Sequence, residues 1–231
     1  MTQETKKSWN HRNLVRAFDH ADTITYNYAQ SDQDIFVLSM LNGQHAGTYL
    51  EIGAGWPLHI SNTALLELDF GWTGISIDYQ DAYPQMWQDQ GRKTLVQDDA
   101  LKVDFHQLLS KMPTIIDYLS LDCDPGWVTL EILKRLPLDL YRFKVITFEH
   151  DCHNEGPAIK LASRQFLQDH GYQMVVGNIS EQGISCDYED WWVYPDLVDH
   201  ERLRAHTCLD DCVKNYKTYL YKLNTSLSNY D

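Results

Sequence analysis

Short apolar runs recur along the middle of the chain, separated by amphipathic segments. Runs rich in β-branched and aromatic residues predict five strands, at residues 48–52, 73–77, 94–96, 115–121 and 143–148. Helical spacing predicts a helix after each of the first four strands, at residues 59/60–69, 84–90, 105–111 and 128–136. Strands and helices that alternate in this way are typical of a parallel sheet covered by helices on both faces.

The pattern changes after the fifth strand. The sequence predicts a helix at 161–170, then a sixth strand at 172–176 and a seventh at 191–194, which can pair as an antiparallel hairpin around residues 181–190. Residues 197–221 are predicted to be largely helical. The predicted fold class is therefore α/β, with a mostly parallel seven-stranded sheet that ends in an antiparallel hairpin.

Two further helices, at residues 9–18 and 33–41, are predicted before the first strand and therefore outside the core sheet. Whether this segment covers a ligand pocket or only packs against the core stays open. We expect one domain over residues 1–231, with an N-terminal helical arm (1–43), a core sheet (48–194) and a C-terminal helix (196–223).

Composition narrows the class of protein. The 231 residues contain no apolar run of membrane-spanning length and begin with a polar segment, so we expect a cytoplasmic protein without a membrane partner. A formal net charge of −14 argues against nucleic acid as a partner, since phosphate backbones are bound by Lys and Arg. The five cysteines have no repeated spacing, which favours reduced thiols over a disulfide framework or a zinc site.

The first predicted strand ends at a glycine turn, Gly53-Ala54-Gly55. Glycine lets the backbone bend sharply and approach a ligand where a Cβ atom would collide. The next strand ends at Asp78, 25 residues after the first glycine. A strand, glycine turn, helix, strand and acid in this order form a nucleotide-type βαβ unit, in which the acid accepts hydrogen bonds from ribose hydroxyls.

The residues around the turn favour one nucleotide cofactor over others. The third glycine of the dinucleotide fingerprint is absent, and Pro57 and Leu58 stand where a pyrophosphate would need small residues and free N–H groups. Glu51 would repel a pyrophosphate but suits a ligand that carries an ammonium and a sulfonium group. S-adenosylmethionine therefore fits better than NAD, and an NAD-type oxidoreductase is the alternative.

Further acids follow the other predicted strands: Asp98 and Asp99 the third, Asp122 the fourth and Glu149 the fifth. In open α/β sheets, ligands bind at the carboxyl ends of the strands, so these side chains should meet at one edge.

The segments YLEIGAGWPLHISNTALLE, GWTGISID, IDYLSLDCDPG, FKVITFEHD, HGYQMVVGNI and EDWWVYP occur in this order. Together they resemble the FkbM family of S-adenosylmethionine-dependent methyltransferases over residues 31–199, and the element order resembles the class I methyltransferase fold. The resemblance implies an O-methyltransferase that acts on a hydroxyl of a small or sugar-bearing substrate. The sequence identifies neither the acceptor nor the oligomeric state.

The resemblance also implies roles for individual positions. The glycine-turn residues Gly53, Ala54 and Gly55 would face the methionine part of the cofactor. Asp78 would bind the ribose and Tyr79 would flank it. Asp99 or its neighbour Asp98 would meet the adenine amine, although either could instead cap the segment that begins at Ala100.

The catalytic residues are expected after the fourth and fifth strands. Transfer to an alcohol needs a base or a metal ion, and we expect Asp124 to accept the proton, with His150 as the second candidate. Asp122, Glu149 and His150 match positions that hold magnesium in some related sugar O-methyltransferases. Histidine at this position favours manganese or iron over magnesium, or a metal-free site with His150 as base. A third class, a cofactor-binding module without catalysis, is disfavoured because these side chains are intact.

Overall fold

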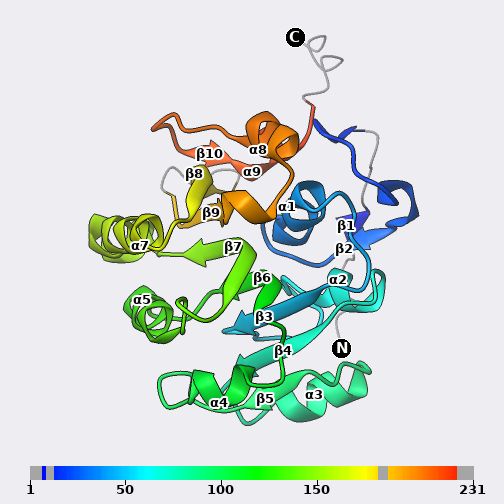
Figure 1. Cartoon of the computed structure of the whole chain (residues 1–231). Helices are drawn as coiled ribbons and strands as arrows, with labels where there is room; N and C mark the ends of the chain where they lie inside the picture. Colours follow the sequence, from blue (N-terminus) through cyan, green and yellow to red (C-terminus); the bar gives the residue numbers. More distant parts are fainter. Residues whose placement is uncertain (1–6, 9–12, 182–186, 223–231) are drawn as a thin grey trace, which may run out of the picture.

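The computed structural model describes residues 7–8, 13–181 and 187–222. Its main sheet has eight strands in the order β10-β8-β9-β7-β6-β3-β4-β5 (Figure 1). The strands are β3 (Thr48–Ile52), β4 (Thr73–Asp78), β5 (Leu95–Gln97), β6 (Ile115–Leu121), β7 (Arg142–Glu149), β8 (Gln173–Ser180), β9 (Glu189–Val193) and β10 (Lys214–Asn215). Neighbouring strands are parallel except at β9, which is antiparallel to both β7 and β8.

The strand order identifies the fold. The chain starts in the middle of the sheet at β3, runs outward through β4 and β5, and then returns to the other side of β3 for β6 and β7. Strand β9 then inserts in the antiparallel direction between β7 and β8. This is the Rossmann-like class I methyltransferase arrangement, so the predicted fold class is confirmed. The change of direction between β3 and β6 is the point at which open α/β sheets bind ligands.

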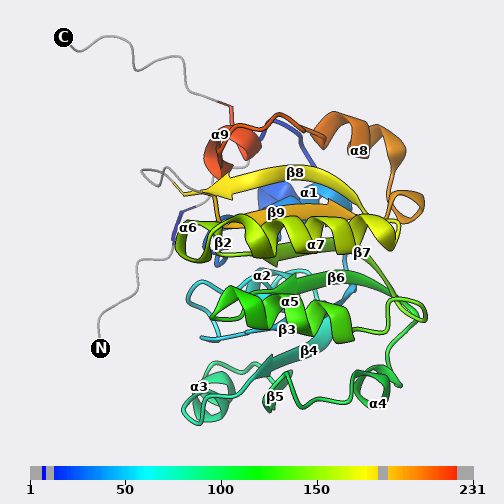
Figure 2. The same ribbon diagram turned by 90° about the vertical axis from the view of Figure 1, so that its left-hand side faces the viewer.

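Helices cover both faces of the sheet. Helices α4 (Phe105–Leu109), α5 (Gly126–Arg135) and α7 (Pro157–Asp169) lie on one face, and α1 (Gln33–Met40), α2 (Ala64–Leu68), α8 (His200–His206) and α9 (Tyr216–Leu220) on the other (Figure 2). The other elements that lie wholly within the described residues are α3 (Tyr83–Asp89), α6 (Cys152–Glu155), the 3₁₀ turns Ala21–Thr23 and Pro195–Leu197, and a separate pair of short strands, β1 (Lys7–Ser8) and β2 (Tyr26–Asn27).

The pleat of the strands divides the core in two. Successive side chains point to opposite faces, so neighbours in sequence enter different hydrophobic clusters. Tyr49, Tyr118 and Trp191 belong to the cluster under α1, and Leu50, Leu119 and Trp192 to the cluster under α5 and α7. Both faces of the central strands are thus buried, which explains why these strands are continuously apolar in sequence.

The C-terminal region differs from the prediction. A largely helical segment over 197–221 is wrong, because α8 ends at His206 and β10 adds an eighth strand parallel to β8. Cys208 also forms a bridge with Val176 on β8. Pairing with the open edge of β8 satisfies backbone groups that a helix would have satisfied internally. Residue 223 of the predicted helix, and residues 182–186 of the predicted hairpin turn, lie outside the described residues.

The N-terminal arm is only partly helical. The described part of the predicted helix at 9–18 is irregular, and Leu14 pairs with Tyr221 instead. Helix α1 is present where it was predicted, and all of its residues are buried. Phe36 of α1 stacks on Trp191 of β9, with 4.4 Å between the ring centroids. Residues 1–6 and 9–12 of the arm lie outside the described residues.

The first helix after the glycine turn is also shorter than predicted. It begins at Ala64, and residues 56–63 form a loop held by hydrogen bonds to other parts of the chain. Within the described ranges, no helix has both the length and the apolar character needed to span a membrane.

Candidate cofactor and acceptor site

A cavity of about 450 Å³ lies at the carboxyl ends of β3, β4, β5 and β6. This volume falls within the usual range for small-molecule sites. Its lining includes Gly53, Gly55, Trp56, Ile60, Asp78, Tyr79, Tyr83, Asp98, Asp99, Leu101, Asp122, Asp124, Val128 and Ile132. Three of the predicted cofactor acids, Asp78, Asp98 and Asp99, thus share one cavity with the predicted catalytic acids Asp122 and Asp124.

The two glycines of the turn have different physical roles. Gly53 has φ +84°, and a Cβ atom there would lie 1.7 Å from the carbonyl oxygen of Asp122. It is glycine because the end of β3 packs directly against the end of β6. Gly55 also has a left-handed φ of +55°, but a Cβ there would meet no atom within 4 Å. Gly55 therefore leaves open space beside the cavity, as a backbone cradle for a ligand requires.

Asp78 is held in place by the backbone around it. Its Oδ2 accepts a hydrogen bond from the Gly55 N–H at 2.9 Å, and its Oδ1 accepts one from the Gln80 N–H at 3.0 Å. A carboxylate has about four acceptor positions, so both oxygens can accept more bonds from vicinal hydroxyls. Tyr79, next to it, is 68% exposed and lines the cavity. This geometry suits the predicted ribose contact.

Asp98 and Asp99 lie at the end of β5, and both line the cavity. Asp98 Oδ1 accepts from the Asp99 N–H at 2.8 Å, and Asp99 Oδ1 accepts from the Leu101 N–H at 3.0 Å. Lys102 forms an ion pair with Asp99 at 2.9 Å, and its hydrogen bond lowers the pKa of the Asp99 carboxyl. Both carboxylates stabilise the local turn and still face the cavity, so the capping role and the predicted adenine contact are compatible.

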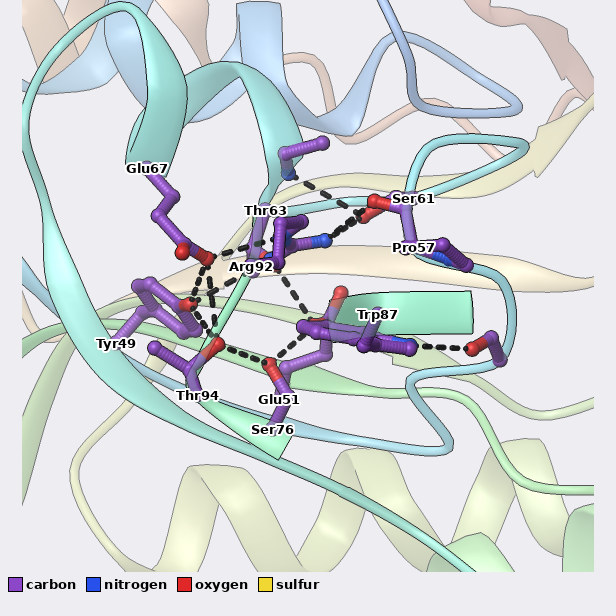
Figure 3. Close-up of polar contacts among 12 residues, drawn as sticks. Tyr49, Glu51, Pro57, Ser61, Thr63, Glu67, Ser76, Trp87, Arg92 and Thr94 are labelled. Atoms are coloured by element: carbon purple, nitrogen blue, oxygen red, sulfur yellow. Dashed lines mark hydrogen bonds and ion pairs between the residues drawn. The ribbon is translucent and has the colours of Figure 1, made fainter. Parts of the chain in front are cut away.

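Glu51 and Ala54 lie behind the cavity wall. Glu51 is buried, and its Oε2 accepts from Thr63 Oγ1 at 2.7 Å and from Ser76 Oγ at 2.8 Å (Figure 3). Burial raises the pKa of the Glu51 carboxyl, while nearby Arg92 opposes this effect. Ala54 packs against Tyr83 in a small buried cluster. Neither residue is part of the cavity lining, so the structure does not place the Glu51 or Ala54 side chain at the predicted cofactor position.

The ends of β6 and β7 bring two acids together. Asp122 and Glu149 lie close enough for their charges to interact. Burial raises the pKa of both carboxyls, and their mutual repulsion raises that of Glu149 further. Asp151 is close enough to interact with the pair, and burial raises its pKa also. Asp122 is part of the cavity lining, whereas Glu149 is not.

His150 does not join these acids. Its side chain is fully buried, and its Nε2 lies 3.6 Å from both Asp187 Oδ2 and Asp190 Oδ1. Arg164 forms a bidentate ion pair with the same Asp190. Because consecutive residues of an extended chain point in opposite directions, Glu149 and His150 cannot both face the cavity.

The predicted metal set of Asp122, Glu149 and His150 is therefore not assembled. Among the described residues, no group of three or more His, Cys, Asp or Glu side chains is arranged to hold a metal ion. The same burial keeps His150 away from any substrate in the cavity, whereas Asp124 is exposed and lines it.

Sequence reasoning missed several residues of the site. Trp56, Ile60 and Tyr83 line the cavity, and Arg92 holds the loop that contains the first two. Trp56 follows the glycine turn directly and Tyr83 lies five residues after Asp78, so their positions in the sequence could have predicted that both line the cavity. Arg92 belongs to no motif, and only the folded chain reveals its contacts.

Comparison with known proteins adds little. No family model matches the chain, and no curated protein matches it. The resemblance to the FkbM family therefore stays a prediction.

Several solved structures share part of the arrangement. They include a candidate rRNA methylase from Clostridium thermocellum (12% identity, 73% of this chain and 96% of that chain covered, TM-score 0.49) and precorrin-6y C5,15-methyltransferase from Geobacter metallireducens GS-15 (16%, 69% and 87%, 0.45). A third is magnesium protoporphyrin IX methyltransferase from Synechocystis PCC 6803 with bound SAM (13%, 69% and 74%, 0.44). At these identities and TM-scores the similarity adds nothing to what the strand order shows.

Proposed function

We propose that this chain is an S-adenosylmethionine-dependent methyltransferase. The observation that carries the proposal is the backbone-held carboxylate of Asp78 opposite the open cradle at Gly55, inside a cavity at the switch point of a class I methyltransferase sheet. An acid that accepts from two backbone N–H groups is fixed in orientation, as recognition of a ribose diol requires.

The charge of the cavity supports this cofactor over NAD. Among the residues that the structure describes, its lining includes the acids Asp78, Asp98, Asp99, Asp122 and Asp124 and no Lys or Arg. Carboxylates attract a ligand that carries ammonium and sulfonium groups, and they repel a pyrophosphate. In this proposal Asp78 binds the ribose, Asp98 and Asp99 lie at the adenine end, and the backbone of the glycine turn faces the methionine part.

We propose further that the methyl acceptor is a hydroxyl of a small or glycosylated molecule, as the resemblance to the FkbM family implies. The cofactor supplies a methyl group on a positively charged sulfur. Asp124 lines the same cavity and accepts the hydroxyl proton as the new carbon–oxygen bond forms and the carbon–sulfur bond breaks. Holding the hydroxyl in line supplies a large part of the rate, on the order of 7–11 kcal/mol in favourable cases. The acidic chain does not favour nucleic acid as the acceptor.

Ligand binding tests the proposal. S-adenosylhomocysteine should raise the melting temperature of the wild type. At a hundredfold excess over Kd, ligand binding adds about 2.7 kcal/mol to the free energy of unfolding. NAD should produce no shift. Asp78→Asn removes one of the two carboxylate oxygens and should weaken binding about 10- to 150-fold, as expected for a hydrogen bond to a charged group.

The acceptor step needs a separate measurement. Asp124→Asn should bind S-adenosylhomocysteine like the wild type but lose transfer of a labelled methyl group to a panel of sugars and glycosides. A melting shift with NAD and none with S-adenosylhomocysteine would refute the methyltransferase proposal. Normal transfer by D124N would refute only the role of Asp124.

A further inference from the structure

We propose that Arg92 is the positioning residue of the loop at residues 56–63, here called the cofactor loop, and holds it in the shape that lines the cavity. The identity of the ligand rests on the function proposed above, whereas the role of Arg92 in holding the loop does not. Arg92 lies between α3 and β5, outside the loop itself, and it is 1% exposed.

The guanidinium of Arg92 binds the loop at three points (Figure 3). Its Nη1 donates to the carbonyl oxygen of Pro57 at 2.7 Å and to Ser61 Oγ at 2.9 Å, and its Nη2 donates to Thr63 Oγ1 at 2.7 Å. Its Nε donates to Glu67 on α2 at 2.9 Å. One side chain thus connects both ends of the loop to the helix that follows it.

The surroundings hold the guanidinium itself in one orientation. It stacks on the Trp87 ring, with 3.9 Å from Cζ to the ring centroid, and the Trp87 Nε1–H donates to the carbonyl oxygen of Gly55 at 3.0 Å. Glu67 balances its charge, and Glu51 accepts from the same Thr63 hydroxyl that Arg92 binds. A buried charge with its donors used in this way is rigid.

The segment between these anchors needs such support. Ile60 has a left-handed φ of +49° and is 46% exposed, and its side chain lines the cavity. This conformation is a genuine outlier for a β-branched residue, so the surrounding structure must impose it. Arg92 binds Pro57 and Ser61 on either side of Ile60, which fixes the path of the chain through the strained residue.

Only arginine can make this set of contacts. The planar guanidinium presents five N–H donors in fixed directions, whereas lysine concentrates three donors on one nitrogen. Lysine at position 92 can keep the charge near Glu67, but it cannot bind Pro57 and Thr63 at the same time. Arg92→Lys therefore removes contacts to the loop while keeping the buried positive charge.

Hydrogen exchange of the ligand-free protein tests the role in holding the loop. In R92K, peptides covering residues 53–63 should exchange at least about tenfold faster than in the wild type, while peptides from β6 and β7 keep their rates. Arg164→Lys is the matched control, because Arg164 also forms an ion pair with a carboxylate, that of Asp190, and its hydrogen bonds go to Asp190 and Asn178 instead of the loop. R164K should leave the exchange of residues 53–63 unchanged.

Titration with S-adenosylhomocysteine tests the consequence for the ligand. R92K should weaken binding at least about tenfold, since an unsupported loop must be ordered when the ligand binds. R164K should bind like the wild type even if its melting temperature falls as far as that of R92K, which excludes general loss of stability as the cause.

The outcomes separate the two proposals. Equal exchange of residues 53–63 in R92K and the wild type would overturn the positioning role, as would equal affinity of the two for S-adenosylhomocysteine. A wild type that does not bind S-adenosylhomocysteine would refute the proposed function, and the exchange data would then decide the role of Arg92 alone.

Discussion

The carboxyl edge of the sheet has two halves, and acidic side chains have different surroundings in each. The cofactor half, named for its proposed role, lies at the ends of β3, β4 and β5. It holds Asp78 and Asp99, which line the cavity and whose oxygens accept from backbone N–H groups. The acceptor half, also named for its proposed role, lies at the ends of β6 and β7 and the start of β9. It holds Glu149 and Glu189, whose nearest charged neighbours include other acids.

The difference decides which carboxyl groups stay charged. In the cofactor half, the ion pair with Lys102 lowers the pKa of Asp99, which favours the anion that accepts hydrogen bonds. In the acceptor half, burial and then the charge of Asp122 raise the pKa of Glu189 to about 8. The cofactor half is therefore arranged for binding, and the acceptor half retains protons near neutral pH.

The largest expected effect on stability comes from the contact between the ends of β3 and β6, where the two halves meet. Gly53→Ala would place a Cβ against the Asp122 carbonyl, which adds overpacking of about 1–3 kcal/mol to a left-handed conformation costing about 1–2 kcal/mol. We expect G53A to lose about 2–5 kcal/mol of unfolding free energy in urea. Gly55→Ala has open space around the new Cβ, so it should lose only the conformational cost of about 1–2 kcal/mol. Equal losses in the two variants would contradict the close packing of β3 against β6.

The two halves also differ in how far the sequence predicted them. Gly53, Gly55 and Asp78 were found because a turn of the backbone and a strand end impose residue types at fixed spacing. His150 was misplaced because its spacing resembles a ligand set, while its orientation depends on Asp187 and Asp190, which are distant in sequence.

In the fold, too, local patterns were predictable from the sequence, whereas contacts between distant segments were not. The strands of the sheet were predictable because burial on both faces makes them apolar. The helix expected over 197–221 was wrong because pairing of β10 with the edge of β8 overrides local helical spacing. Arg92 could not be predicted, since its role depends on loop atoms that only folding brings within reach.

The second prediction concerns the proton of the acceptor half. Glu189 has a pKa raised from 4.5 to about 8, so the folded state keeps its proton over a pH range in which the unfolded state releases it. The stability of the wild type should therefore fall as the pH rises from about 4.5 to 8. Glu189→Gln removes this titration and can keep the hydrogen bond from Gln33.

Denaturation curves between pH 5 and 8 check this effect. E189Q should show a shallower decline than the wild type, and at pH 8 it should gain on the order of 4 kcal/mol relative to the wild type. Glu131→Gln, at an exposed ion pair with Lys134, should keep the slope of the wild type. A slope in E189Q as steep as that of the wild type would mean that Glu189 is already ionised in the folded state.

The smallest expected effect tests the cofactor half. Lys102 pairs with Asp99 at the surface, where solvent screens the interaction, so Lys102→Ala should leave the melting temperature unchanged. The Asp99 carboxylate would remain held by the Leu101 N–H and would lose a competing donor. If it accepts from the adenine amine, K102A should bind S-adenosylhomocysteine slightly more tightly, by less than about fivefold. Calorimetric titration measures the change. Weaker binding in K102A would show that Lys102 orients Asp99 instead of competing for it.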